Sequence, residues 1–337
     1  MLTRDRLSFQ WTTLSAWTLA VPLVLYGLTG CTINPQSIER STQESTQKLD
    51  KQINPQPAVL ANQPIGANAT AKLARSSEDN PDVLQAIIQG DQSAGEVNSS
   101  PAQVVYLAEN HNSAADHAAQ LEIVQSLAEA GDIAIALEMF QRPFQAPLDA
   151  YLAGEITEAE LVEQSEYETR WGFDWELYAP IIRYAKAQSI PLIALNTPAE
   201  VTRKVAREGL AGLSGEDLEH IPPIAEVDTS NVAHRKWVGE VFNAHGGAGH
   251  SLNFENFYAA QVLWDETMAA RIATQLDAEP NRRVVVLAGE GHVVYGHGIP
   301  SRVERRLPEV TQASVQLVAP EEDAEAGVTD FVWITGQ

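Results

Sequence analysis

The sequence predicts an α/β fold, with a central, mostly parallel sheet flanked by helices and a largely helical insertion. Short apolar runs, typical of strands buried on both faces, occur at residues 104–107, 133–137, 192–195 and 284–288. Helical patterns separate these runs, which favours strands that run parallel and are joined by helices. Each run ends in polar residues, and open α/β sheets bind their ligands at that end of the strands.

The N-terminal residues are typical of a secretory signal. Arg4 and Arg6 precede an apolar stretch that ends in Leu-Thr-Gly-Cys31, which looks like a bacterial lipobox. Cys31 is the only cysteine, so we expect a lipid anchor there, with no internal disulfide and no cysteine-based metal site. The alternative is one spanning helix with an unmodified thiol, because the stretch is nearly long enough. We expect an exported bacterial lipoprotein of the cell envelope, at the outer membrane or the periplasmic face of the plasma membrane.

The sequence divides into a signal peptide at 1–30, a flexible polar tether at 31–79 and an α/β domain at 80–337. Pro81 at a helix start marks the beginning of the domain. The formal charge of −23 argues against nucleic acid as a partner, because neutralising phosphates requires a basic surface. It also leaves no polybasic patch for anionic lipids, so attachment to the membrane depends on the lipid at Cys31.

A helical insertion is expected at roughly 146–278. Its first part, 146–188, is rich in aromatic residues, which we interpret as core. Its last part contains a histidine- and glycine-rich loop at 245–250, followed by an amphipathic helix at 258–276. Two further apolar runs, at 314–318 and 331–335, predict the strands that complete the sheet.

Six polar residues come after the predicted strands and are expected to share one rim. They are Glu109, His111, Glu138, Asn196, Glu290 and His292. Each alone is best explained as a loop side chain, but their common placement favours a site. We expect Glu109, His111, Glu138 and His292 to converge in one crevice and to be the catalytic residues if the protein is an enzyme.

Imidazole and carboxylate groups together suit a divalent metal, here bound by Glu109, His111 and His292, with a carboxylate left over as general base for a metal-bound water. A metal-free alternative has the same groups bonded to one another, holding the loops. No Gly-x-Ser-x-Gly elbow comes after a strand and there is no Walker A sequence. The segment GEGHVV from Gly289 lacks the third glycine of a dinucleotide fingerprint.

Several short blocks, in order, resemble the ChaN-like haem-binding uptake family. The blocks are LAENH at 107–111, ALEMF at 136–140, IALNTP at 193–198, WDETMA at 264–269, GEGH at 289–292 and GIPSR at 298–302. The family belongs to a superfamily with the Tiki metalloproteases and erythromycin esterases, marked by two Gly-x-x-His elements. Here Ala108 replaces the glycine of the first element, while Gly289 to His292 is intact.

The resemblance implies a lipid-anchored surface protein that binds haem for iron acquisition, with iron ligated by tyrosine and haems stacked between two subunits of a homodimer. Tyr258 is the first candidate ligand and Tyr295 the second, with His250 and His297 as neighbouring hydrogen-bond partners. Both tyrosines also suit the core. The functions that remain are haem binding and metal-dependent hydrolysis at the Glu/His rim.

Overall fold

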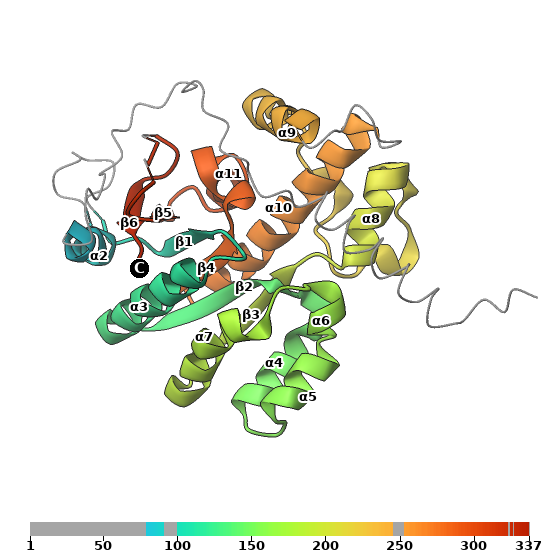
Figure 1. Cartoon of the computed structure of the whole chain (residues 1–337). Helices are drawn as coiled ribbons and strands as arrows, with labels where there is room; N and C mark the ends of the chain where they lie inside the picture. The colour runs from blue at the N-terminus through green and yellow to red at the C-terminus, as the bar shows by residue number, and fades with distance from the viewer. Residues whose placement is uncertain (1–78, 91–99, 245–252, 323, 326, 337) are drawn as a thin grey trace, which may run out of the picture. The chain divides into compact units, whose positions relative to one another are not determined.

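The computed structural model describes residues 79–90, 100–244, 253–322, 324–325 and 327–336. In this part of the chain, six strands form one sheet in the order β3-β2-β4-β1-β5-β6, and every neighbouring pair is parallel (Figure 1). The strands are β1 (Val104–Glu109), β2 (Ile133–Gln141), β3 (Leu192–Asn196), β4 (Arg283–Gly289), β5 (Gln312–Val318) and β6 (Phe331–Ile334).

Helices cover both faces of this sheet. One face packs against α2 (Asn80–Gln89), α3 (Ala114–Ala130), α4 (Gln145–Leu152), α5 (Glu158–Gln164), α6 (Tyr167–Arg170) and α7 (Trp175–Gln188). The other packs against α8 (Ala199–Glu208), α9 (Val232–Ala244), α10 (Phe254–Ala278) and α11 (Ile299–Arg306). Short 3-10 turns complete the described chain: η3 (Arg142–Phe144), η4 (Leu210–Gly212), η5 (Gly215–Leu218), η6 (Ile224–Glu226), η8 (Glu290–His292) and η9 (Val294–Gly296).

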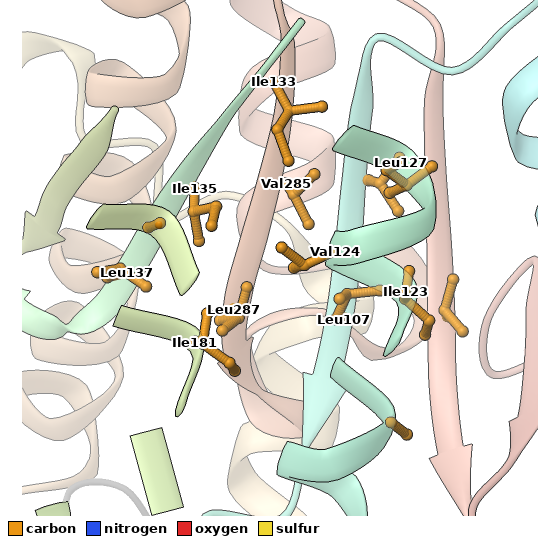
Figure 2. Close-up of a cluster of buried hydrophobic side chains, with 14 of the residues drawn as sticks. Leu107, Ile123, Val124, Leu127, Ile133, Ile135, Leu137, Ile181, Val285 and Leu287 are labelled. Atoms are coloured by element: carbon orange, nitrogen blue, oxygen red, sulfur yellow. The ribbon is translucent and has the colours of Figure 1, made fainter. Parts of the chain in front are cut away.

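The strands are apolar along most of their length because both of their faces are buried. On β1, Val105 and Leu107 belong to one core, whereas Val104 and Tyr106 belong to the other, as the pleat of a strand requires. Figure 2 shows the first core, in which side chains of α3 and α7 meet those of β1, β2 and β4. Burying one such Leu, Ile or Val side chain contributes about 1.5–3 kcal/mol.

At each edge of the sheet, a side-chain amide bonds to backbone groups that a further strand would otherwise pair with. On β3, the Gln145 amide donates to the carbonyl of Leu192 and accepts from the N–H of Ala194, both at 2.8 Å. On β6, the Asn80 amide donates to the carbonyl of Ile334 at 2.8 Å and accepts from its N–H at 3.1 Å. Edge backbone groups that would otherwise lack a partner are satisfied at these positions.

The predicted fold class is confirmed, and the sheet of the described residues is parallel throughout. Strand β2 continues through Glu138 to Gln141, beyond the end at residue 137 that the sequence suggested, and its register with β3 shifts between Leu137 and Gln141. The segment 146–278 does not form a unit of its own. Its helices supply layers on both sheet faces, and β3 lies between them.

The aromatic residues between 146 and 188 lie in or against the first core, as expected. The predicted signal peptide, the polar tether and Cys31 lie outside the described residues, as does His250. Among the helices that are described, none has the length and apolar character needed to span a membrane.

Candidate functional site

The carboxyl ends of three adjacent strands bring the four predicted catalytic residues together. Glu109 is the last residue of β1, and Glu138 lies in β2 just beyond the end of its pairing with β4. His292 comes after β4 on η8, and His111 comes two residues after β1. All four side chains are at most 3% exposed, so the expected convergence is present, but in the interior of the protein and not in an open crevice.

Glu109 is held by three donors. His111 Nδ1 lies 2.8 Å and the Tyr178 hydroxyl 2.6 Å from its Oε1, while the Gln120 amide donates to Oε2 at 2.6 Å. Burial alone would raise the pKa of Glu109, but the hydrogen bond and charge of His111 lower it to about 2. Burial would also lower the pKa of His111, yet its bond to Glu109 and the charge of Glu138 raise it. Glu109 is therefore ionised at neutral pH, and its hydrogen bond favours the charged form of the His111 ring.

His292 lies between two carboxylates. Its Nδ1 is 2.6 Å from Asp265 Oδ1 and its Nε2 is 3.3 Å from Glu138 Oε1. Burial would lower the pKa of His292, but the charge of Glu138 and the bond to Asp265 raise it to about 10. The ring is therefore an imidazolium at neutral pH, hydrogen-bonded to Asp265 through Nδ1 and paired by charge with Glu138 on its Nε2 side.

Gly289 joins the two pairs. Its N–H donates to Glu138 Oε2 at 2.7 Å, and a Cβ on this residue would lie 2.7 Å from both Nε2 and Cε1 of His111. The Nε2 side of His111 thus packs directly on the backbone of Gly289, next to Glu138. His111 is bonded at Nδ1 to Glu109, and His292 is bonded at Nδ1 to Asp265. The Nε2 side of each ring faces the region of Glu138 and Gly289. Only a residue without a side chain permits this approach.

Two aromatic side chains pack against the ring of His111. The ring centroids of Trp171 and Phe173 lie 4.8 and 4.9 Å from the centroid of the His111 ring. Both residues belong to the connection between α6 and α7, and both are only partly buried. They separate the imidazole from solvent.

The buried network continues beyond Asp265 into α9 and α11. Asp265 Oδ2 lies 3.7 Å from His234 Nε2 and 3.8 Å from Arg302 Nη1. Burial lowers the pKa of His234 to about 4, so this imidazole is neutral at pH 7. Arg302 Nη2 is 3.3 Å from His234 Nδ1, the nitrogen available as an acceptor when the proton is on Nε2.

The expected metal finds no support in the described residues. Glu109 is occupied by three donors, and its partner His111 is bonded through Nδ1. Across the ranges that the structure describes, no group of three or more His, Cys, Asp or Glu residues has an arrangement that would hold a metal ion. The metal-free alternative, in which the groups bond to one another, describes what is seen.

The remaining rim residues lie at the same end of the sheet. Asn196 donates to the backbone carbonyl of Glu138 at 2.8 Å and so supports the irregular part of β2. Glu290 is partly buried and accepts from Gln316 at 3.4 Å. Burial raises the pKa of Glu290 to about 7.

The two candidate haem ligands differ in their surroundings. Tyr258 is 1% exposed in the second core, and its hydroxyl donates to the carbonyl of Asn231 at 3.1 Å. Burial raises its pKa to about 12. Tyr295 lies on η9, half-buried, with its ring centroid 5.9 Å from that of His297, and burial raises its pKa as well.

Five residues of this network were not identified from the sequence: Gln120, Tyr178, His234, Asp265 and Arg302. Asp265 had a detectable signal, since two adjacent carboxylates interrupt an otherwise apolar stretch of helix. Gln120 occurs three residues after His117, on the same helix face. Tyr178 was one of many aromatic residues assigned to the core, and nothing local distinguished it.

Comparison with known proteins gives a match to a family, a curated relative and a solved structure of similar fold. Residues 98–303 match the family described as haem-binding uptake, Tiki superfamily, ChaN. A curated relative, RETICULATA-RELATED 5 of Arabidopsis thaliana, a chloroplastic protein, is 29% identical over 263 residues. That match covers 69% of this chain but only 34% of the plant protein, so the chain spans about a third of that relative.

Among solved structures, ChaN of Campylobacter jejuni, described with cofacial haem binding, has a TM-score of 0.55 at 18% identity. The match covers 76% of this chain and 92% of that one, which shows a shared fold. An erythromycin esterase in its open conformation has a TM-score of 0.42 at 15% identity, covering 74% of this chain and 76% of the esterase.

Proposed function

Because this chain belongs to the haem-binding uptake family of the Tiki superfamily, as its sequence blocks indicated, we propose that it binds haem and serves haem or iron acquisition. The family match, which extends over more than half of the chain, is the observation that carries this proposal. The fold shared with a ChaN protein described with cofacial haem supports it.

Tyr295 is the proposed ligand of the haem iron. Its backbone is left-handed, with φ 58° and ψ 9°, a conformation that costs a residue with a Cβ about 1–2 kcal/mol. Such outliers persist where the surroundings impose them, and they cluster at functional sites. Tyr295 is also partly exposed and next to His297, whereas Tyr258 would have to leave the core and its bond to Asn231.

Haem titration of the full chain in detergent tests both the function and the ligand. We expect a Soret band and the charge-transfer band of tyrosinate on ferric iron. Tyr295→Phe should abolish the charge-transfer band, and Tyr258→Phe, the matched control, should retain it. The reverse result would move the ligand to Tyr258, and no Soret change in the parent protein would refute haem binding.

The lipid anchor and the dimer are part of the same proposal. A lipid on Cys31 attaches the protein to the cell envelope, supported by the lipobox. Haem bridges two copies in a homodimer, supported by the family. Sedimentation with and without haem should show a dimer only with haem, and only when Tyr295 is present.

Hydrolysis at the buried Glu/His centre is the second candidate function. The observation in its favour is the pair of imidazoles, each oriented by an outer carboxylate, on either side of Glu138. The residues do not fit a metal, so no metal-dependent step is assigned. Turnover of p-nitrophenyl acetate that Glu138→Gln abolishes would support catalysis, and an equal rate in both proteins would reject it.

A further inference from the structure

The buried side chain of Arg302 supports the turn that carries Tyr295. Arg302 Nη1 donates to the carbonyl of His297 at 2.5 Å and to that of Gly298 at 2.8 Å. The hydroxyl of Ser301 donates to the same two carbonyls, at 2.9 and 3.2 Å. Since Arg302 is only 3% exposed, this guanidinium is fixed in the interior and acts as a rigid support for the turn.

The turn itself has two successive residues with positive φ, Tyr295 at 58° and Gly296 at 66°. The N–H of Tyr295 donates to the carbonyl of Val328 at 2.7 Å, which ties the turn to the segment that precedes β6. Gly298 passes so close to the chain that a Cβ on it would lie 2.1 Å from the carbonyl oxygen of His292. The turn is therefore packed directly against the residue that links Glu138 to Asp265.

The same guanidinium also contacts the buried centre. Its Nη1 lies 3.8 Å from Asp265 Oδ2, and its Nη2 lies 3.3 Å from His234 Nδ1. Asp265 uses its other oxygen to hold His292 at 2.6 Å. One side chain thus contacts both the turn that presents Tyr295 and the carboxylate that orients His292.

We propose that Arg302 is a positioning residue that fixes the Tyr295 turn and couples it, through Asp265, to the buried imidazole centre. The coupling rests on the proposed haem function, because Tyr295 is the ligand it positions. The physical basis is that Asp265 restrains the guanidinium by charge and so restrains the carbonyls bonded to it. Loss of either residue releases the same turn.

Arg305 provides the matched control. It lies three residues further along α11, and its guanidinium binds Glu266 at 2.7 Å and Asp228 at 3.6 Å. Arg302 shares the Glu266 partner, with its Nε 3.4 Å from Glu266 Oε1, whereas these contacts of Arg305 are not to the turn. A general weakening of α11 would affect Arg302→Lys and Arg305→Lys alike, whereas the proposed clamp is specific to Arg302.

Hydrogen exchange of the full chain in detergent, without haem, is the first measurement. Arg302→Lys should speed exchange of the amides at 295–297 by about tenfold or more, and Arg305→Lys should leave it unchanged. Asp265→Asn should speed the same amides in the parent protein and add nothing when Arg302 is already lysine. Equal exchange in Arg302→Lys and the parent would overturn the clamp, and additive effects of the two substitutions would overturn the coupling.

Haem titration of the same proteins separates this inference from the proposed function. Arg302→Lys should shift or weaken the tyrosinate charge-transfer band, and Arg305→Lys should not. If the parent binds no haem but exchange responds as expected, the haem function fails and the clamp stands. If Arg302→Lys unfolds, Ser301→Ala, which removes only the second donor to the turn, should still speed exchange at 295–297. Unchanged exchange in Ser301→Ala would then count against the clamp.

Discussion

Substituting alanine for Gly289 is a sharp test of the buried centre. The backbone there has φ −58° and ψ 147°, which alanine adopts freely, so the substitution introduces no backbone strain. Alanine in place of glycine by itself stabilises a protein by about 0.4–1 kcal/mol, because the unfolded chain has less freedom to lose. Only the clash of the new methyl group lowers the free energy of unfolding.

The clash is larger than this gain. The new Cβ would lie 2.7 Å from two atoms of the His111 ring, and carbon contacts are favourable only from about 3.5 Å. The ring must shift by roughly 0.8 Å, although Trp171 and Phe173 pack against it and Glu109 holds it. Overpacking costs about 1–3 kcal/mol, and a lost hydrogen bond to a charged group about 1.5–3 kcal/mol.

The net expectation is a loss of about 2–5 kcal/mol in the free energy of unfolding, measured by urea denaturation. Gly131→Ala is the control, since no atom lies within 4 Å of its Cβ position and its φ of 166° is extended. Gly291→Ala tests the same loop with an ordinary 3.7 Å contact to Trp237. If Gly289→Ala unfolds at the same urea concentration as these two, the packing described for His111 is wrong.

One pH dependence and three more substitutions probe the buried centre and the anchor. The pKa of His292 is raised to about 10 from an unfolded value near ~6.5. Its contribution to the free energy of unfolding is therefore complete below pH 6.5 and is lost as the pH rises through 10. The free energy of unfolding measured in urea should fall across that window. Asp265→Asn should cost about 3 kcal/mol at pH 7 and flatten that fall; an unchanged slope would contradict the assignment. Tyr178→Phe removes one donor from Glu109 and should raise the midpoint pH of acid unfolding, with a cost of about 1–3 kcal/mol at pH 7; an unmoved midpoint would show that the bond does not hold the carboxylate. Cys31→Ser should move the protein from the detergent to the aqueous phase on partitioning, and retention in the detergent phase would exclude the lipid.

The sequence alone was sufficient for the sheet and for the carboxyl ends of β1, β3 and β4, to within one or two residues. Apolar runs such as 104–107 and 284–288 are local, and a parallel sheet brings the residues after each run to the same end. This reasoning located Glu109, His111 and His292. It placed Glu138 at the end of its strand, whereas β2 continues, because an irregular ladder with β3 is a tertiary property and leaves no local pattern.

The roles of Asp265 and Arg302 in the site could not be predicted from the sequence for a different reason. Both lie inside helices, where spacing tells which face a residue occupies but not what that face meets. Their partners are 27 residues away for the Asp265–His292 bond and 68 residues away for the Arg302–His234 contact. Pairings of that kind depend on how α9, α10 and α11 pack together, which no periodicity encodes.

The amides at the two sheet edges constrain how a second copy of the chain can dock. A strand from another molecule that approached β3 would find Gln145 already bonded to Leu192 and Ala194, and at β6 it would meet Asn80 on Ile334. It would have to displace an ordered side chain before making its own backbone bonds. Continuous sheets across two subunits are therefore disfavoured at these positions, so the proposed haem-bridged dimer is expected to use other surfaces of the chain.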